Sequence, residues 1–248
     1  MLKDTLKDIL DHTQGLGFID MVKVTGDNNE TKIEAMDASR SVVVYGTLHD
    51  SVESLNGVIG LARMSVLNGY LRFPPFQDPA AKIEVVRENR GDQQVPSEVK
   101  FSAPGGHRST YRFMSSELVE EQIKIPVFRG TTWDVTISPT DGNIKDLSYF
   151  SSILSSFEQN FVAKTVDNDL VLSIGSGSND RTDVPFARGV SGTLAGRWGW
   201  PISETLSVLK LASRSTDCVM SFSEKGAMKI AFSTEQGKFE YILPAKAI

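Results

Sequence analysis

The sequence has little of the chemistry from which most enzymes and metal proteins build their sites. Its 248 residues include one cysteine and three histidines. A single cysteine excludes an internal disulfide framework and a multi-cysteine metal site. Cys218 adjoins the strand-like run VMSFS, so we expect it to be buried rather than nucleophilic. His12, His49 and His107 are scattered and lack the spacing of a metal-binding pair. We therefore expect no catalysis, no cofactor and no metal.

Long apolar runs are also missing. None approaches the roughly 18 residues that a membrane-spanning helix needs, and the N-terminal MLKDTLKDILDH lacks the apolar core of a secretory signal. Hydrophobic residues at 40% and charged residues at 23% are typical of a folded soluble protein. These features predict a cytoplasmic protein without a membrane partner. The formal charge of −5 argues against a positive coat, but it leaves room for one local basic surface.

Two glycine- or tryptophan-rich stretches look like ligand loops but lack the residues that such loops need. GSGSNDRTD (175–183) has neither the Lys-Ser/Thr of a P-loop nor the third glycine of a dinucleotide fingerprint. We interpret it as a hairpin tip. GRWGWPISE (196–204) could stack bases, but it precedes a helical pattern. We interpret it as a packing loop in which Trp198 and Trp200 shield the helix start, with Pro201 near the first turn.

A weak internal repeat sets the expected architecture. VKVTGDN (22–28) and VAKTVDN (162–168) are short alternating runs that each end in a turn signal. Each follows a segment with helical spacing of apolar residues. Asp141 is a candidate N-cap of the second of these helices. The apolar positions are Leu2, Leu6, Ile9 and Leu10 in the first helix, and Ile144, Leu147 and Leu154 beside Phe150 in the second.

The two halves continue in the same order, with strands, a Gly-Thr-Leu triplet, a second helix and closing strands. The second helices are predicted at 54–67 and 202–214. The order predicts two similar α+β domains, 1–113 and 129–248, joined by a connector at 114–128. The predicted strands are 32–37, 41–48, 82–88, 98–103 and 109–114 in the first half, and 170–175, 187–194, 218–223, 228–233 and 239–245 in the second.

Three motifs, in this order and spacing, resemble the DNA sliding clamps, the processivity factors of DNA polymerases. They are KIEAMDASRSVVV (32–44), SLNGVIGLARM (54–64) and KFEYILPAK (238–246). The resemblance is to clamps of T-even-type phages and to the eukaryotic and archaeal clamp. Two features depart from the family pattern. Helix-like sequence begins almost at Met1, where relatives have a strand, and Pro244-Ala245 inverts the usual Ala-Pro order.

The resemblance implies a non-catalytic ring with helices inside and sheets outside. A two-domain chain of this length resembles the clamps that form homotrimers. The implied partners are double-stranded DNA, a DNA polymerase and a clamp loader. Cations on the helix faces would meet phosphates without reading bases, although Asp4, Asp8, Asp11 and Asp146 lie on the same helices. The DNA-facing candidates are Lys3, Lys7, Arg63, Lys145, Lys210 and Arg214.

The resemblance also implies an apolar cleft that accepts short peptides from the polymerase and other partners. Flexible methionine and apolar strand residues suit such a cleft. The alternative is that Met36 and Ile242 are core residues and that Pro244 ends a strand. The residues matched to the cleft and its lid are Met36, Ile123, Ile125, Pro126, Tyr241, Ile242, Leu243, Pro244 and Ala245.

Two other functions stay open from the sequence. A β-rich structural or assembly protein of a phage would also be acidic, repeat-built and without catalytic residues. It would need neither cations confined to helix faces nor an apolar peptide cleft. An enzyme whose site assembles from dispersed carboxylates is a third possibility, and no motif favours it. We take the sliding clamp as the leading hypothesis.

Overall fold

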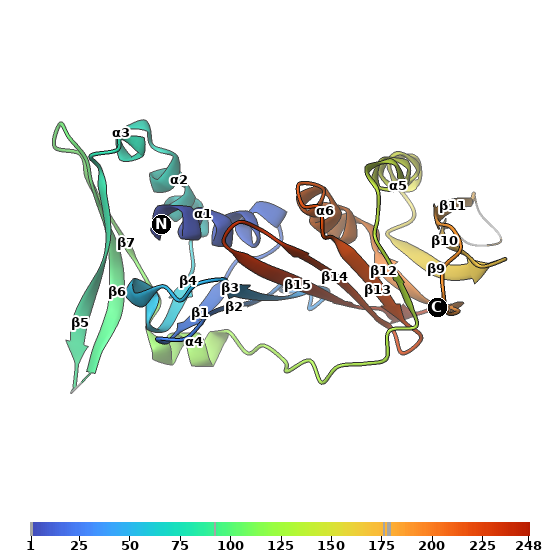
Figure 1. Ribbon diagram of the computed structural model, residues 1–248, viewed down its shortest axis with the longest axis horizontal. Coiled ribbons are helices and arrows are strands. Elements are labelled where there is room, and N and C mark those ends of the chain that lie inside the picture. The colour runs from blue at the N-terminus through green and yellow to red at the C-terminus, as the bar shows by residue number, and fades with distance from the viewer. Residues whose placement is uncertain (1, 92, 176, 178–179) are drawn as a thin grey trace. The chain divides into compact units, whose positions relative to one another are not determined.

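The computed structural model describes residues 2–91, 93–175, 177 and 180–248, which divide into two compact units. Both units combine helices with antiparallel strands (Figure 1), which confirms the predicted α+β class with two similar domains. The domain boundaries predicted from the sequence stay a prediction. The first unit contains the residues up to Ala38, Val44–Pro126 and Thr234–Phe239, and the second contains Ser39–Val43, Val127–Ser233 and Glu240–Ile248.

The first unit begins with a helix, continues through strands and short helices, and ends in a three-stranded hairpin arrangement and a further helix. Its elements are α1 (Leu2–Asp11), β1 (Val22–Gly26), β2 (Thr31–Met36), β3 (Val43–Leu48), β4 (Gly57–Leu61), α2 (Met64–Arg72), α3 (Pro74–Gln77), β5 (Lys82–Arg90), β6 (Gln93–Ser102), β7 (Arg108–Arg112) and α4 (Ser116–Gln122), with 3-10 turns at Gln14–Leu16 and Glu53–Leu55.

The second unit repeats the order of helix, strands, helix and strands. Its elements are β8 (Val135–Ile137), α5 (Asp141–Leu154), β9 (Asn160–Val166), β10 (Asp169–Ile174), β11 (Thr182–Ala187), β12 (Ala195–Pro201), α6 (Ile202–Ala212), β13 (Val219–Ser223), β14 (Ala227–Ser233), β15 (Gly237–Pro244) and β16 (Lys246–Ala247). Of β15, only the residues from Glu240 on belong to the second unit.

Alternating apolar side chains fix the registers of the first unit's strands. Val22 and Val24 of β1 are fully buried and pair with Ala35 and Ile33 of β2, so one face of the sheet forms the core. The strand order is β4-β1-β2-β3, and a separate sheet has the order β5-β6-β7. These neighbours confirm the strands predicted around 22–28, 32–37 and 41–48.

The second unit's five-stranded sheet has the order β11-β10-β9-β12-β16, and β8, β13 and β14 pair beside one another. Its core centres on Trp200, which is almost fully buried. The Trp200 ring lies 6.1 Å from that of Phe161 and 5.4 Å, edge-on, from that of Phe222. The Trp200 indole N–H also donates to the carbonyl oxygen of Leu243 over 3.2 Å.

α5 begins with a reciprocal cap at Thr140, so Asp141 is the first helical residue and not the N-cap that the sequence predicts. The Thr140 hydroxyl accepts from the Asn143 N–H over 3.2 Å, and the Thr140 N–H donates to Asn143 Oδ1 over 3.1 Å. This capping box satisfies two backbone groups at once. α5 packs on β10 and β11, and α6 packs on β12 and β14, so both helices cover strands of the second unit (Figure 1).

The prediction of one helix over 54–67 is wrong. Residues 57–61 form β4, whose Ile59 and Leu61 pair with β1, and the helix α2 starts only at Met64. Gly57 has a φ of 115°, which no helix accommodates. A Cβ on Gly60 would lie 2.6 Å from a methyl carbon of Val119. The glycines therefore serve a strand that packs closely against α4, and not a helix.

Two predictions in the second half are also wrong. The strand expected at 187–194 lies earlier, as β11, because Gly189 and Gly192 have φ values of 60° and 91° that break an extended run. The packing loop expected at 196–204 is instead strand β12 followed by the start of α6. The hairpin tip expected at 175–183 falls between the paired strands β10 and β11, and residues 176, 178 and 179 lie outside the described residues.

A late segment of the chain, residues 234–239, completes the first unit. The backbone N–H of His49, just after β3, donates to the backbone carbonyl oxygen of Gln236 over 2.8 Å. The His12 ring stacks on Phe239 with ring centroids 4.1 Å apart. Thr234 donates its hydroxyl to an Asp8 carboxylate oxygen over 3.1 Å. Both α1 and β3 are therefore held by residues close to 240.

We expect the stability of the second unit to fall in acid because of Asp217. The Ser215 hydroxyl and the Ser233 N–H donate to its carboxylate, and these bonds lower the pKa of Asp217 to about 2. A lowered folded-state pKa stabilises the fold above the ordinary carboxyl pKa, near 4, and this contribution is lost as the pH falls from about 4 to about 2.

Asp217→Asn should lower the free energy of unfolding at pH 7 by about 1 kcal/mol, a modest value because the carboxylate is exposed. Urea unfolding between pH 2 and pH 7 should show the difference from the unmodified chain closing in acid. Asp50→Asn, which neutralises another exposed carboxylate, is the control. If the free energies of unfolding of Asp217→Asn and of the unmodified chain differed by the same amount at every pH, the stabilising role of the Asp217 carboxylate would be contradicted.

Candidate nucleic-acid interface

α1 buries Leu6, Ile9 and Leu10. Lys3 and Lys7 are half-buried, four residues apart, and flank this apolar face. The Lys7 ammonium donates to Gln77 Oε1 over 3.3 Å, so a neighbouring segment holds this cation in place. Asp4 and Asp11 are exposed on the same helix. The two predicted cations of α1 are therefore partly accessible to solvent, but exposed carboxylates lie on the same helix.

Asp8 is one of the carboxylates that argue against a basic face on α1, but its side chain is bound to other residues of the first unit. Its carboxylate lies 3.4 Å from the His12 ring nitrogen and accepts from Thr234. Burial raises the pKa of the Asp8 carboxyl, and the His12 charge and the Thr234 hydroxyl act against that rise. Asp8 therefore helps to hold α1 to residues 234–239 and contributes less negative potential to the surface than an exposed carboxylate would.

Arg63 lies immediately before α2, not on a helix as predicted. It is exposed and has a left-handed φ of 50°. The Tyr111 hydroxyl donates to the carbonyl oxygen of Ala62 and so supports this backbone turn. Burial raises the pKa of Tyr111 to about 12, so the hydroxyl keeps the proton that it donates. Arg72, an exposed cation in the last turn of α2, was not among the predicted DNA-facing residues, because the helix was predicted to end at 67.

The cations of the second unit also lie away from its core. α5 buries Ile144 and Leu147 and exposes Lys145. α6 exposes Lys210, and Arg214 is exposed two residues beyond the end of that helix. Exposed Asp146 follows Lys145 directly. In each unit, cations thus lie on or next to two helices and away from the core, where they can contact the phosphates of a nucleic acid.

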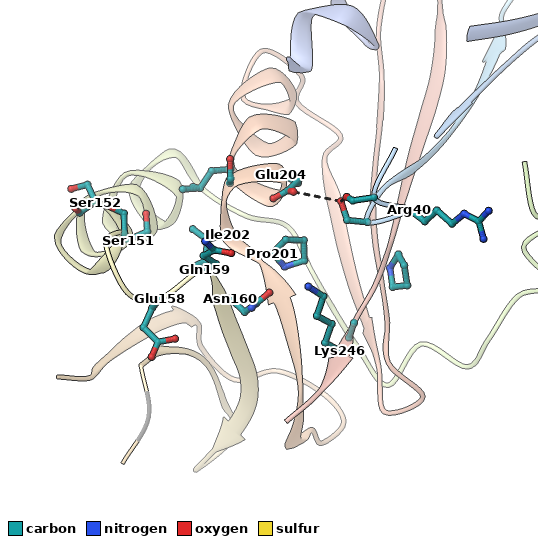
Figure 2. A pocket seen from close by; sticks show the side chains of 17 residues that line it. Arg40, Ser151, Ser152, Glu158, Gln159, Asn160, Pro201, Ile202, Glu204 and Lys246 are labelled. Carbon is teal, nitrogen blue, oxygen red and sulfur yellow. Dashed lines mark hydrogen bonds between the residues drawn. The ribbon is translucent and has the colours of Figure 1, made fainter. Parts of the chain in front are cut away.

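A groove of about 680 Å³ lies in the second unit, between the end of α5, the start of α6 and the C-terminal strand. Figure 2 shows Ser151, Ser152, Asn160 and Ile202 around it. The Ser41 hydroxyl donates to Glu204 Oε1 over 3.5 Å, which ties the 39–41 loop to α6. The lining residues are Ser39–Ser41, Ser151, Ser152, Ser155, Glu158–Asn160, Pro201–Glu204, Leu206 and Pro244–Lys246.

The groove is suited to a peptide more than to a reaction. Serine hydroxyls and the Gln159 and Asn160 amides line its wall, and Pro201, Ile202 and Leu206 supply apolar surface. Charged residues also line the groove, namely Arg40, Glu158, Glu204 and Lys246. The Arg40 side chain points away from the other labelled side chains (Figure 2). Such a surface can pair with backbone amides and accept small apolar side chains.

Two solved structures resemble this fold over nearly the whole chain. One is the PCNA of Thermococcus kodakaraensis, with a TM-score of 0.66, 10% identity, and 99% of this chain and 97% of that one covered. The other is the A. fulgidus PCNA bound to the C-terminal region of FEN-1, with a TM-score of 0.68, 10% identity, and 98% and 96% covered. No family model matches the sequence, and no curated protein matches it.

The chain has the sliding-clamp fold. The likeness confirms the fold that the sequence motifs suggest, and at 10% identity it concerns the fold alone. It does not distinguish a phage type from the archaeal type.

The residues assigned to the peptide cleft of the clamp fold fall in different environments. Pro244 and Ala245 line the groove. Tyr241, Ile242 and Leu243 are buried in β15. In the first unit, Met36, Ile123 and Ile125 are half-buried and Pro126 is exposed. The Tyr45 hydroxyl donates to the carbonyl oxygen of Pro126 over 2.6 Å and holds the end of that segment. Their joint role as one cleft stays a prediction.

The three histidines each pack or bond within the first unit. His12 is buried, His49 lies 3.2 Å from the carbonyl oxygen of Thr234, and the ring of His107 packs edge-on against Phe73. No group of three metal-binding side chains occurs among the residues that the structure describes. Within the same described ranges, no helix has the length and apolar character that crossing a bilayer requires.

Cys218 should resist alkylation in the folded protein. Burial, reinforced by the charge of Asp217, raises the pKa of its thiol to about 11, so almost none is thiolate at pH 8. We expect iodoacetamide to react about 100-fold or more faster after unfolding in urea, where the pKa returns to about 8.5. Mass spectrometry of timed samples measures both rates, and Cys218→Ser gives the background. Equal rates would show that the thiol is accessible.

Proposed function

We propose that this protein is a sliding clamp that encircles duplex DNA and tethers the replicative DNA polymerase, without catalysis of its own. The observation that carries the proposal is the clamp fold over 96–99% of both compared chains and of this one. The cations of α1, α5 and α6 are a second support, because they lie away from the buried faces of these helices, where phosphates can reach them, although acidic residues of the same helices accompany them. The comparisons give no support to a phage structural protein.

The clamp would bind DNA through phosphates. Long flexible lysine and arginine side chains release counterions when they approach phosphates, and they carry no sequence information in doing so. This lets a ring slide. The candidate contacts are the six predicted cations, Lys3, Lys7, Arg63, Lys145, Lys210 and Arg214, together with Arg72.

The ring would be a homotrimer, as expected for a two-domain clamp chain. β11 and β7 each lie at an end of their sheets, so each has an outer edge that a second copy can pair with. A head-to-tail contact of this kind closes into a ring only at a fixed rotation. A clamp loader would open and close it around DNA, and loader and polymerase would share the peptide groove.

Topological linkage to DNA tests the function directly. The protein should stay on circular duplex DNA through a high-salt wash once it has been loaded, and it should leave when the DNA is cut. Gel filtration of the DNA, before and after cutting, measures the retained protein. Retention on linear DNA with free ends, or failure to stay on the circle, would refute encirclement.

Lys210→Glu with Arg214→Glu should weaken the DNA contact without changing the oligomer mass. We expect the slope of the logarithm of the binding constant against that of salt concentration to fall by about 1 to 2, and polymerase stimulation at physiological salt to drop. Lys225→Glu with Arg197→Glu makes the same charge change at exposed positions outside the helices and should have little effect. Equal losses in both pairs would argue for a general charge effect.

Ala245→Arg tests the groove as the partner site. The half-buried Ala245 lines the groove, so a long side chain there should occupy it. We expect stimulation of the polymerase from the same genome to fall by about tenfold or more, the effect of removing one interface anchor. Retention on circular DNA should be unchanged. Lys238→Arg, at an exposed strand position outside the groove, is the control. Unaltered stimulation by Ala245→Arg would move the partner site elsewhere.

A further inference from the structure

β5 is an end strand, and its outer edge has no backbone partner among the described residues. Its sheet has the order β5-β6-β7, so β6 pairs with one side of β5 and the other side is open (Figure 1). The Ser97 hydroxyl of β6 also donates to the carbonyl oxygen of Val86 over 3.1 Å. In an antiparallel pair, alternate residues of an end strand turn their N–H and C=O groups outward. These outward groups of β5 can receive a further strand.

The second half of the chain shows what covers the equivalent edge. β13, β14 and β15 follow α6 in the same way that β5, β6 and β7 follow α2 and α3. In the second unit, β8 pairs antiparallel with β13 on the side away from β14. β8 has only three residues. A very short strand therefore suffices to cover an edge of this kind.

Residues 83–85 of β5 correspond to residues 220–222 of β13. Each triplet has an apolar, a polar and an apolar residue, and each central residue lies opposite a lysine of the next strand. The pairs are Ile83 with Phe101, Glu84 with Lys100 and Val85 with Val99 in the first unit, and Met220 with Ile230, Ser221 with Lys229 and Phe222 with Met228 in the second.

The two triplets differ in burial, and the covered one is the more buried. Met220 and Phe222 are fully buried, whereas Ile83 and Val85 are half-buried. In the second unit, Ile137 and Val135 of β8 lie opposite Met220 and Phe222. Half-buried aliphatic side chains gain favourable free energy when a further strand removes them from water. The edge of β5 thus offers apolar surface together with open backbone groups.

The polar residue of each triplet indicates the chemistry of the residue that would lie opposite. Ser221 accepts a hydrogen bond from the Thr136 hydroxyl of β8 over 3.0 Å. Glu84 is exposed and makes no ion pair in the described part of the chain. Lys100, its neighbour on β6, lies 3.4 Å from a carboxylate oxygen of Glu98. Opposite charges on facing strands attract, so a cation suits the position opposite Glu84.

A hollow of about 340 Å³ beside β5 has a similar charge preference. The Arg87 guanidinium donates to the backbone carbonyl oxygens of Asn56 over 2.8 Å and of Gln94 over 3.2 Å, so this cation is engaged. Glu53 is exposed and, within the described ranges, makes no ion pair. The residues that line the hollow are Glu53, Ser54, Asn56, Val85 and Arg87.

We propose that the outer edge of β5 is a docking site for a short extended segment of another protein. The segment adds as an antiparallel strand, with apolar side chains opposite Ile83 and Val85 and a lysine or arginine opposite Glu84. The site uses residues of the first unit alone, whereas the groove at Ala245 lies in the second. It does not depend on the proposed ring.

A peptide built from β8 tests the site directly. The peptide has the sequence of residues 133–138 with Thr136→Lys, which places a cation opposite Glu84. It should bind the unmodified protein with a dissociation constant below about 1 mM. Hydrogen exchange followed by mass spectrometry should show slower exchange at residues 82–86 when the peptide is present, because outward N–H groups of β5 become bonded. Exchange at β7, the other end strand of this sheet, should not change.

Glu84→Lys should weaken binding of this peptide by about fivefold or more, because like charges then face each other. A second peptide with Thr136→Glu should bind Glu84→Lys more tightly than it binds the unmodified protein, which also shows that the variant is folded. Glu120→Lys makes the same charge change at an exposed position of α4 and is the control. Retention of Glu84→Lys on circular DNA should match that of the unmodified protein, so failure of this site and failure of the clamp function are distinguishable.

A covalently attached strand gives an independent test. β8 leads into α5 through residues 138–140, and α1 contacts β5. A copy of residues 133–140 placed directly before Met1 should therefore reach the edge of β5. This extended chain should no longer bind the peptide, and its residues 82–86 should be protected from exchange without it. The same extension with Val135→Asp and Ile137→Asp should leave the edge open, because carboxylates oppose burial.

Four results would overturn the proposal. The peptide could fail to bind at concentrations up to about 1 mM. It could protect β7 or β11 in place of β5. Glu84→Lys and the unmodified protein could bind both peptides equally, or the attached strand could leave peptide binding unchanged. Protection of residues 82–86 that appears without peptide as the protein concentration rises would show that a second copy of this chain, and not another protein, pairs with β5.

Discussion

Each helix in the two units can bury only one face on the strands beside it, and this constraint decides which surfaces are left for partners. α1 buries Leu6, Ile9 and Leu10, and α5 buries Ile144 and Leu147. What remains outward is then fixed by helical spacing. The chain is acidic as a whole, yet its lysines can act on those outward faces because burial in the fold, and not total charge, determines where each cation lies.

The second unit keeps three chemically different surfaces apart on a small body. The outer side of α5 and α6 offers cations, the groove beside Ala245 offers hydroxyl and amide groups around Ile202, and the β11 side of α5 offers aromatic and aliphatic side chains. Phosphates, peptides and apolar protein surfaces each prefer one of these. Surfaces that are separated in this way could bind different ligands at once, since no surface has to serve two ligands.

Helical spacing and strand alternation predicted much of the fold, including α1, α5, α6 and the β1–β2 pair, and the repeated order of elements predicted two similar domains. The errors have local physical causes. Gly57 and Gly60 sit in apolar sequence that fits a helix by spacing, but the φ of Gly57 and the approach of Val119 to Gly60 require a strand. Arg72 was missed as a consequence. The groove could not be predicted, because Ser41, Ser151 and Ala245 meet only through tertiary packing.

The assignment of residues 234–239 to the first unit ties folding to the order of synthesis. α1 leaves the ribosome before the rest of the first unit, but Phe239, against which His12 stacks, is made more than 200 residues later. The first unit therefore cannot reach its final packing until residue 239 has left the ribosome, although domains generally fold as units during synthesis. Until residue 239 emerges, the surfaces of α1 and β3 that await it stay uncovered, and during this interval the nascent chain is most open to aggregation or to binding by a chaperone.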